Sequence, residues 1–416
     1  MATVLVFGEQ VQVFLSLGKV VNEFLLNSSQ LNGIDVLDGD DVDDISEYVR
    51  SLSISRGRSD QFSSFRAGTL TLVLNNNDRR FDPINESSPY YNSTTARSGV
   101  TPRRRVQIVA DDVPLFTGRV SDIDVEYNYQ LSTVTITAAD EFTLLANTFT
   151  GVASTPPVEL SGARVSRILD LPEVAFPAAS RSIDTGVASL GAYPIAENTN
   201  AANYLGRVAE AEQGLFFVRA DGTLRFTDRA STAFASPVVN FTDAPLSVGL
   251  PYQSLSTIYG NEFLFNRVQV TTETGVPQVA EDAASQTSFG VTTLTLDGVL
   301  LGNDADALTL SEKLLSFYKE PQYRFDDLRL VVSSMSALDR ESVLEVEMGD
   351  VISIERSFDV GSPASVVKEY GVERITHQIL PDRHIVTFGL FDALIVFPLL
   401  LDDPEFGTLD QRNAVA

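Results

Sequence analysis

The side chains suited to nucleophilic or metal chemistry are few in this chain. Its 416 residues include two histidines, His377 and His384, and no cysteine. A Ser-His-Asp triad would need one of these histidines, but no Gly-x-Ser-x-Gly turn accompanies them. Two histidines across a hairpin suit a metal ion, but no third ligand is indicated beside them. We therefore predict surface strand positions for both, and no catalytic residue, cofactor-binding residue or metal ligand.

Carboxylates are abundant, but their spacing indicates no site. The acidic run Asp35–Asp44, DVLDGDDVDD, would suit calcium only with alternate oxygen ligands and a glycine at the sixth loop position. Gly39 instead follows Asp38 directly, so we predict a solvated loop. Among 56 acidic residues no pair stands out for glycoside cleavage, and no phosphate-binding or dinucleotide fingerprint is present.

Arginines gather in a short part of this acidic chain. One interpretation is a strand edge that its charges protect from aggregation. The other is a subunit interface where the arginines meet acidic faces of the next chain, and we favour it. Arg56 and Arg58 add to the same basic region. The candidate subunit interface consists of Arg79, Arg80, Arg103, Arg104 and Arg105.

The overall charge of the chain limits the classes of partner that it can bind. The formal net charge is −26, which repels phosphate, so sequence-specific nucleic-acid binding is not expected. The acidic side chains either keep the protein soluble or line a channel through which DNA passes without binding. The absence of cysteine suits a reducing cytoplasm. We expect no secretion signal and no membrane span, since the apolar run 393–401 is interrupted by Pro398 and falls short of ~20 residues.

Short alternating strands dominate the predicted secondary structure. In 67–75, AGTLTLVLN, three leucines share one face and threonines the other, and similar strands follow at 106–109, 118–127 and 131–139. Strands of this kind between turns favour an antiparallel sandwich or barrel. The predicted fold class is mainly β, with two related β-barrel domains and a small inserted α+β domain.

Changes of pattern suggest four segments. Residues 1–150 form a first β-barrel domain with an N-terminal extension, and 151–245 form the α+β insert. Residues 246–400 form a second β-barrel domain with one helix, and 401–416 are a tail. The insert is predicted to hold helices from Ser161 and over 200–213, and an Asp-Gly hairpin over 215–227. The helix of the second barrel is predicted over 306–318, halted by Pro321.

The two β-rich halves follow one order, which is a short strand, a loop, a long strand, a tight turn, a long strand and an acidic end. In the first half this order runs from Val106 through GRVSDIDVEY to STVTITAADE. In the second it runs from Val351 through GVERITHQI to HIVTFGLFDA. Such a match favours an internal duplication over two unrelated meanders.

The order of several turn-rich motifs resembles the minor tail proteins of tailed bacteriophages. Residues 44–58 and 65–83 resemble the opening of that family, with an Arg-Gly-Arg followed by a block ending in Phe-Asp-Pro. The resemblance continues over most of the chain, weakest at 1–30 and 270–300. The further matching segments are Ser88–Tyr91 (SPYY), Pro102–Val106 (PRRRV), Phe116–Arg119 (FTGR), residues 201–229, residues 349–354 (GDVISI), residues 371–391 and Leu401–Gln411 (LDDPEFGTLDQ).

This resemblance implies a fold similar to the central hub proteins of contractile-phage baseplates. In those proteins two related barrels per chain give a trimer six similar surfaces, which suit a sixfold tail tube. The implied function is that of a structural virion protein, not an enzyme, at the tail tip. There it would adapt or close the tube end and open for DNA ejection. Implied partners are two further copies, a distal tail protein, the tape-measure protein and receptor-binding proteins, assembled in the host cytoplasm.

Two other functions remain open at this point. A tail adhesin for host-surface glycans would need exposed aromatic platforms, and the absence of tryptophan counts against it. A tail-associated cell-wall hydrolase would need a cleft with positioned acids or a metal, and no catalytic motif indicates one.

Overall fold

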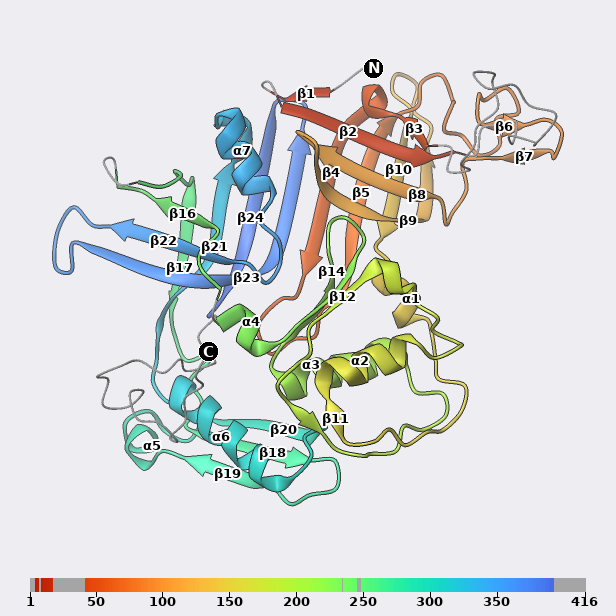
Figure 1. Cartoon of the computed structure of the whole chain (residues 1–416). Coiled ribbons are helices and arrows are strands. Elements are labelled where there is room, and N and C mark those ends of the chain that lie inside the picture. The colour runs from red at the N-terminus through yellow and green to blue at the C-terminus, as the bar shows by residue number, and fades with distance from the viewer. Residues whose placement is uncertain (1–3, 7–8, 18–41, 234, 245–247, 393–416) are drawn as a thin grey trace.

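The computed structural model describes residues 4–6, 9–17, 42–233, 235–244 and 248–392. The mainly β prediction is confirmed, because strands of both halves form one 14-stranded sheet. Figure 1 shows these strands above a body of helices and short sheets. Among the described residues, no helix is both long enough and apolar enough to cross a membrane.

Six strands build the first half of the large sheet, which we call the first framework. Their order is β2, β8, β9, β10, β5, β4, and each pair is antiparallel. Alternating leucines, valines and isoleucines bury one face, as the period-two pattern predicts. Their bounds are β2 Glu9–Ser16, β4 Val49–Gly57, β5 Arg66–Asn75, β8 Arg105–Ala110, β9 Val113–Glu126 and β10 Thr133–Ala139.

Six later strands repeat this order and form the second framework. Their order in the sheet is β16, β22, β23, β24, β21, β17. When the six strands of each framework are numbered along the chain, both frameworks have the spatial order first, fourth, fifth, sixth, third, second. One pair differs, because β16 runs parallel to β22 whereas β2 runs antiparallel to β8. The bounds are β16 Val239–Thr242, β17 Ser254–Tyr259, β21 Tyr323–Val331, β22 Val351–Ser357, β23 Ser365–Leu380 and β24 Arg383–Phe391.

The predicted closed barrels are not formed by the strands that the structure describes. Closure of the first framework would pair β4 with β2, but β4 pairs with β23 of the second framework instead. Only β3 (Val42–Asp44), just before β4, reaches β2. In the second framework Leu250, just before β17, likewise bridges Phe241 of β16. The edge strand β4 of the first framework therefore pairs with β23, an interior strand of the second framework, and does not close a barrel.

We call the contact between β4 and β23 the seam. Arg374 to Ile379 of β23 pair with Leu52 to Gly57 of β4. At the Gly57 end of the seam the two backbones approach so closely that only glycine fits at position 57. Gly57 has a φ of 116°, and a Cβ there would lie 2.1 Å from the carbonyl oxygen of Glu373. One apolar core crosses the seam and includes side chains from both frameworks.

The remaining elements form a second core, which we call the helical body. It takes buried side chains from residues 142–226 and also from 268–318, so both the predicted insert and part of the predicted second barrel contribute. The division at 150, 245 and 400 stays a prediction. The elements are α1 Phe142–Ala146, β11 Glu159–Leu160, α2 Ser161–Leu169, β12 Arg181–Ile183, β13 Ser189–Leu190, α3 Ala201–Glu212, β14 Leu215–Val218, β15 Leu224–Thr227, α4 Arg229–Ala233, β18 Arg267–Thr272, β19 Gln278–Glu281, α5 Ala283–Phe289, β20 Thr293–Val299 and α6 Asp304–Tyr318.

Local signals set the ends of the predicted helices. The side chain of Asn200 accepts a hydrogen bond from the Asn203 amide and starts α3, and Gln213 ends it in the left-handed conformation. Asn303 caps α6 in the same way. The helices predicted over 200–213 and 306–318 and the hairpin of β14 and β15 are confirmed.

Candidate functional site

The prediction that both histidines lie on the surface is wrong. His377 of β23 is 2% exposed and His384 of β24 is 0% exposed. Both strands lie inside the sheet, and the Nδ1 of His377 and the Nε2 of His384 are 3.1 Å apart. Burial, followed by the charge of His384, lowers the pKa of His377 well below its ordinary value. This pair is a buried polar contact within the sheet.

The acidic run of the sequence falls mostly outside the described residues. Residues 35–41 are not described, and the last three residues, Val42–Asp44, form β3. Within the described ranges no group of three His, Asp or Glu side chains is arranged to hold a metal ion.

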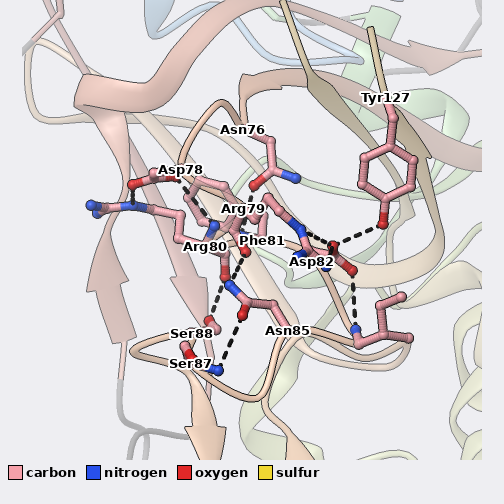
Figure 2. Close-up of polar contacts among 11 residues, drawn as sticks. Asn76, Asp78, Arg79, Arg80, Phe81, Asp82, Asn85, Ser87, Ser88 and Tyr127 are labelled. Atoms are coloured by element: carbon pink, nitrogen blue, oxygen red, sulfur yellow. Dashed lines mark hydrogen bonds and ion pairs between the residues drawn. The ribbon is translucent and has the colours of Figure 1, made fainter. Parts of the chain in front are cut away.

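The connection between β5 and β8, residues 76–104, carries all but one of the candidate arginines. Its first part, residues 76–88, is held by its own side chains (Figure 2). The fully buried Asn76 accepts a hydrogen bond of 2.9 Å from the Phe81 amide. The hydroxyl of Ser88 donates to the Arg80 carbonyl oxygen at 2.5 Å. Asn and Asp side chains that bond nearby backbone fix a loop without regular secondary structure.

Asp82 is the centre of this loop, as Figure 2 shows. Its carboxylate accepts hydrogen bonds from the Arg79 guanidinium at 2.7 Å, from the Tyr127 hydroxyl at 2.8 Å and from the Ile84 amide at 3.1 Å. Burial raises the pKa of Asp82, but the bonds from Tyr127 and Arg79 outweigh this and lower it overall. Arg79 therefore already has a carboxylate partner within its own loop.

Arg80 is also occupied within the chain. Its Nε donates to Asp78 at 2.6 Å, and its guanidinium lies over the Tyr48 ring, 3.9 Å from the centroid. Stacking over an aromatic ring beside a carboxylate suits a guanidinium better than an ammonium group. Arg79 and Arg80 thus stabilise the loop, a role that their sequence did not indicate.

The three consecutive arginines are presented differently. Arg103 and Arg105 are exposed, and Arg104 is half-buried with its Nε 3.2 Å from the Gly99 carbonyl oxygen. The backbone of Arg103 is in the left-handed region, with a φ of 68°, and its amide donates to the Val120 carbonyl oxygen. The predicted interface therefore divides into Arg79 and Arg80, whose side chains bind carboxylates of their own loop, and the group at 103–105, in which Arg103 and Arg105 are exposed. That this group binds another subunit stays a prediction.

Two charged pairs at the seam were missed as a feature of the site. Arg56 of β4 and Arg58, one residue beyond the end of β4, both bind carboxylates at the seam. The Nη1 of Arg56 lies 2.7 Å from Glu347, and the Nε of Arg58 lies 3.0 Å from Glu373. Glu347 also accepts the amide of Ala220, so one buried carboxylate joins both frameworks and the hairpin of the helical body. The signal was the pair of arginines two residues apart at the end of a strand with alternating apolar residues.

Comparison of the whole chain with known proteins finds similarity in structure alone. No protein-family model and no curated protein matches the sequence. A tail protein of Neisseria meningitidis MC58 superposes with a TM-score of 0.57 at 12% identity, over 92% of this chain and 96% of that one. The 43 kDa tail protein of prophage MuSo2 from Shewanella oneidensis gives 0.56 at 11% identity, over 92% and 99%.

A chain of the Francisella PdpA–VgrG complex is also similar, with a TM-score of 0.50 at 8% identity. It covers 92% of this chain, and the match spans 53% of its own length. Since the two tail proteins match nearly end to end, the chain as a whole has the fold of phage tail proteins. At these identities the likeness establishes the fold and leaves function to be argued.

Proposed function

We propose that this chain is a structural subunit of a phage-type tail, placed at the tail tip or baseplate hub. The observation that carries the proposal is the repeated strand order, because the six strands of each framework lie in the same spatial order within one chain. Three copies would offer six similar frameworks, which is the number that a sixfold tube requires. The end-to-end likeness to two tail proteins supports the same role.

In this role the chain forms a homotrimer and acts by binding rather than by catalysis. The trimer closes or adapts the end of the tail tube in the virion and opens for DNA ejection. It contacts a distal tail protein, the tape-measure protein and receptor-binding proteins, and it is assembled in the host cytoplasm. The group at 103–105, in which Arg103 and Arg105 are exposed, binds an acidic face of the neighbouring copy.

The proposal is tested by the mass of the purified chain in solution and by its shape in negative-stain images. We expect three-fold rings with six similar lobes. The variant Arg103→Glu with Arg105→Glu is expected to shift the mass toward the monomer while the unfolding midpoint changes little, since neither side chain is buried. Arg383→Glu, the same type of exposed charge reversal at the first residue of β24, is the control, compared with each single arginine variant.

Two outcomes would contradict parts of this proposal. A chain that stays monomeric at high concentration, alone and with tail-tube protein, would remove the hub role. Rings that survive reversal of both arginines would retain the hub role and remove the arginine interface.

A further inference from the structure

A small hollow lies where the two frameworks meet the helical body, and we call it the acidic hollow. It measures about 60 Å³. Its walls come from the β4–β5 connection, the residues after β17, the end of α6, and strands β21, β23 and β24. These elements meet on the left of Figure 1, away from β6 (Tyr91–Asn92) and β7 (Arg97–Ser98). A hollow of this size holds a few water molecules or the charged end of one side chain.

Negative charge dominates the wall of the hollow. Among the described lining residues, the carboxylates outnumber the one cationic residue, Arg324. Arg324 is already engaged, since it pairs with Glu262 at 3.2 Å and lies over the Phe263 ring at 4.0 Å. The lining carboxylates are Asp60, Glu262, Asp326, Glu373 and Asp392.

One of these carboxylates is left for a ligand. Within the described part of the chain Asp326 makes no hydrogen bond or ion pair, although it is half-buried beside Asp327. Burial, and then the charge of Asp327, raises the pKa of Asp326. A cation placed against it would relieve both effects.

A buried hydroxyl supplies an independent sign of an absent partner. Tyr318 is 3% exposed, and its hydroxyl oxygen has no hydrogen-bond partner among the described residues. Burial, and then the charge of Asp392, raises the pKa of Tyr318, with smaller effects from Arg58, Arg324 and Glu373. Tyr318 lines the hollow together with Asp392, Arg324 and Glu373. A buried hydroxyl without a partner is unfavourable, and a bound donor would remove that cost.

Aromatic rings complete the wall. Phe263, Phe317, Tyr318 and Tyr370 line the hollow together with Phe391. A flat guanidinium stacks on such rings and offers five N–H donors to several oxygens at once, whereas a compact ammonium group stays more strongly hydrated. The chemistry of the hollow therefore favours arginine over lysine.

We propose that the acidic hollow receives an arginine side chain from a partner protein chain. The guanidinium lies among the rings, donates to Asp326 and to the Tyr318 hydroxyl, and offsets the excess of carboxylates. The partner is anchored where both frameworks and the helical body meet, so it binds only the folded arrangement of all three. This site does not depend on the trimer or on a role in a tail.

Methylguanidinium chloride is the probe for this proposal, added to the full chain labelled with 3-fluorotyrosine. The fluorine signals of Tyr318 and Tyr370 report on the hollow, and that of Tyr129, which is 98% exposed, reports on the remote surface. We expect saturable shifts of the first two signals with a millimolar dissociation constant. Sodium chloride at equal ionic strength is expected to leave them in place.

Variants separate the site from general charge attraction. Asp326→Asn is expected to weaken binding by about fivefold or more, since it removes the free carboxylate. Asp122→Asn removes the same charge from the exposed face of β9 and is expected to change nothing. Glu262→Gln, at an exposed position, tests the hollow again if Asp326→Asn fails to fold.

Three results would overturn the proposal. Shifts that rise linearly without saturation would show that no site exists. Equal weakening by Asp122→Asn would reduce the effect to the overall charge. Much tighter binding in Arg412→Gln would mean that the chain's own C-terminal segment fills the hollow, and not a partner.

Discussion

The two frameworks share one strand order but differ in the connections that they carry. In the first framework the link between the third and fourth strands is the polar loop of residues 76–104, held by Asn76 and Asp82. In the second framework the same link, residues 332–350, carries α7 (Ala337–Leu344), whose Arg340 binds Asp111 of the β8–β9 turn at 2.8 Å. The link between the second and third strands is short in the first framework. In the second it holds β18 to α6.

This difference distinguishes the strands, which both frameworks share, from the connections, which vary. The strands repeat because their alternating apolar faces must cover one core. The connections diverge because only some of their side chains, such as Phe81 and Val343, enter that core, so they can present arginines in one framework and a small subdomain in the other. Even the acidic residues that end the sixth strands, Asp140 and Asp392, take different places, since one is buried and the other lines the acidic hollow.

Loss of the seam carboxylate should have the largest effect on the pairing of the frameworks. Glu347→Ala leaves the buried Arg56 without its ion pair and the Ala220 amide without its acceptor. We expect the free energy of unfolding to fall by about 3–5 kcal/mol in urea titrations. Glu345→Ala, an exposed change two residues away, is the control and should stay within about 0.5 kcal/mol. A loss below about 1 kcal/mol for Glu347→Ala would mean that the seam does not depend on this pair.

Equivalent core positions should respond equally if the frameworks are energetically alike. Leu72 and Leu328 occupy the third strands, β5 and β21, and both are 0% exposed. Each change to alanine is expected to lower the free energy of unfolding by about 3 kcal/mol in one cooperative transition. Thr71→Ala, on the exposed face of β5, is the control. Two separate transitions for either leucine variant would break the comparison, because the frameworks would then unfold independently.

The buried end of the first framework should make stability depend on pH. Burial raises the pKa of Asp140 to about 7 from the ordinary 3.8, so the folded state holds its proton more tightly than the unfolded state. Its contribution to folding is therefore complete below pH 3.8 and is lost as the pH rises through 7. In the wild-type chain the free energy of unfolding should fall between pH 5 and pH 7.5. We expect this fall to be about 2 kcal/mol smaller in Asp140→Asn.

The same pH series provides the control for Asp140. Asp122→Asn, exposed on β9, should retain the full decrease of the wild-type chain. Some decrease should remain in Asp140→Asn, because burial also raises the pKa of Glu373 to about 7. An identical pH profile for wild type and Asp140→Asn would show that the carboxyl is not held protonated.

The smallest effect is expected in the loop that distinguishes the first framework. Asp82→Ala removes the acceptor of Arg79, Tyr127 and the Ile84 amide and should cost about 1 kcal/mol in urea unfolding. Asp78→Ala, an exposed change in the same loop, should cost less. A loss as large as that of Leu72→Ala would mean that the Asp82 contacts stabilise the fold as much as a core leucine does.

Local patterns in the sequence were sufficient for the individual elements. The alternation of β5, the Asn cap of α3 and the Asp-Gly turn between β14 and β15 act over a few residues, so they can be predicted without the rest of the chain. The repeated order of β22, β23 and β24 was visible for the same reason, because each half carries its own complete pattern.

Only the tertiary structure decided how these elements meet. The pairing of β4 with β23 joins residues more than 300 positions apart, and that choice leaves the first framework open and places His377 inside the sheet. It also decided the partners of the arginines, since Arg56 pairs with Glu347 and Arg79 with Asp82. The sequence determines which side chains are apolar or charged, but burial and partners depend on distances that exist only after the chain has folded.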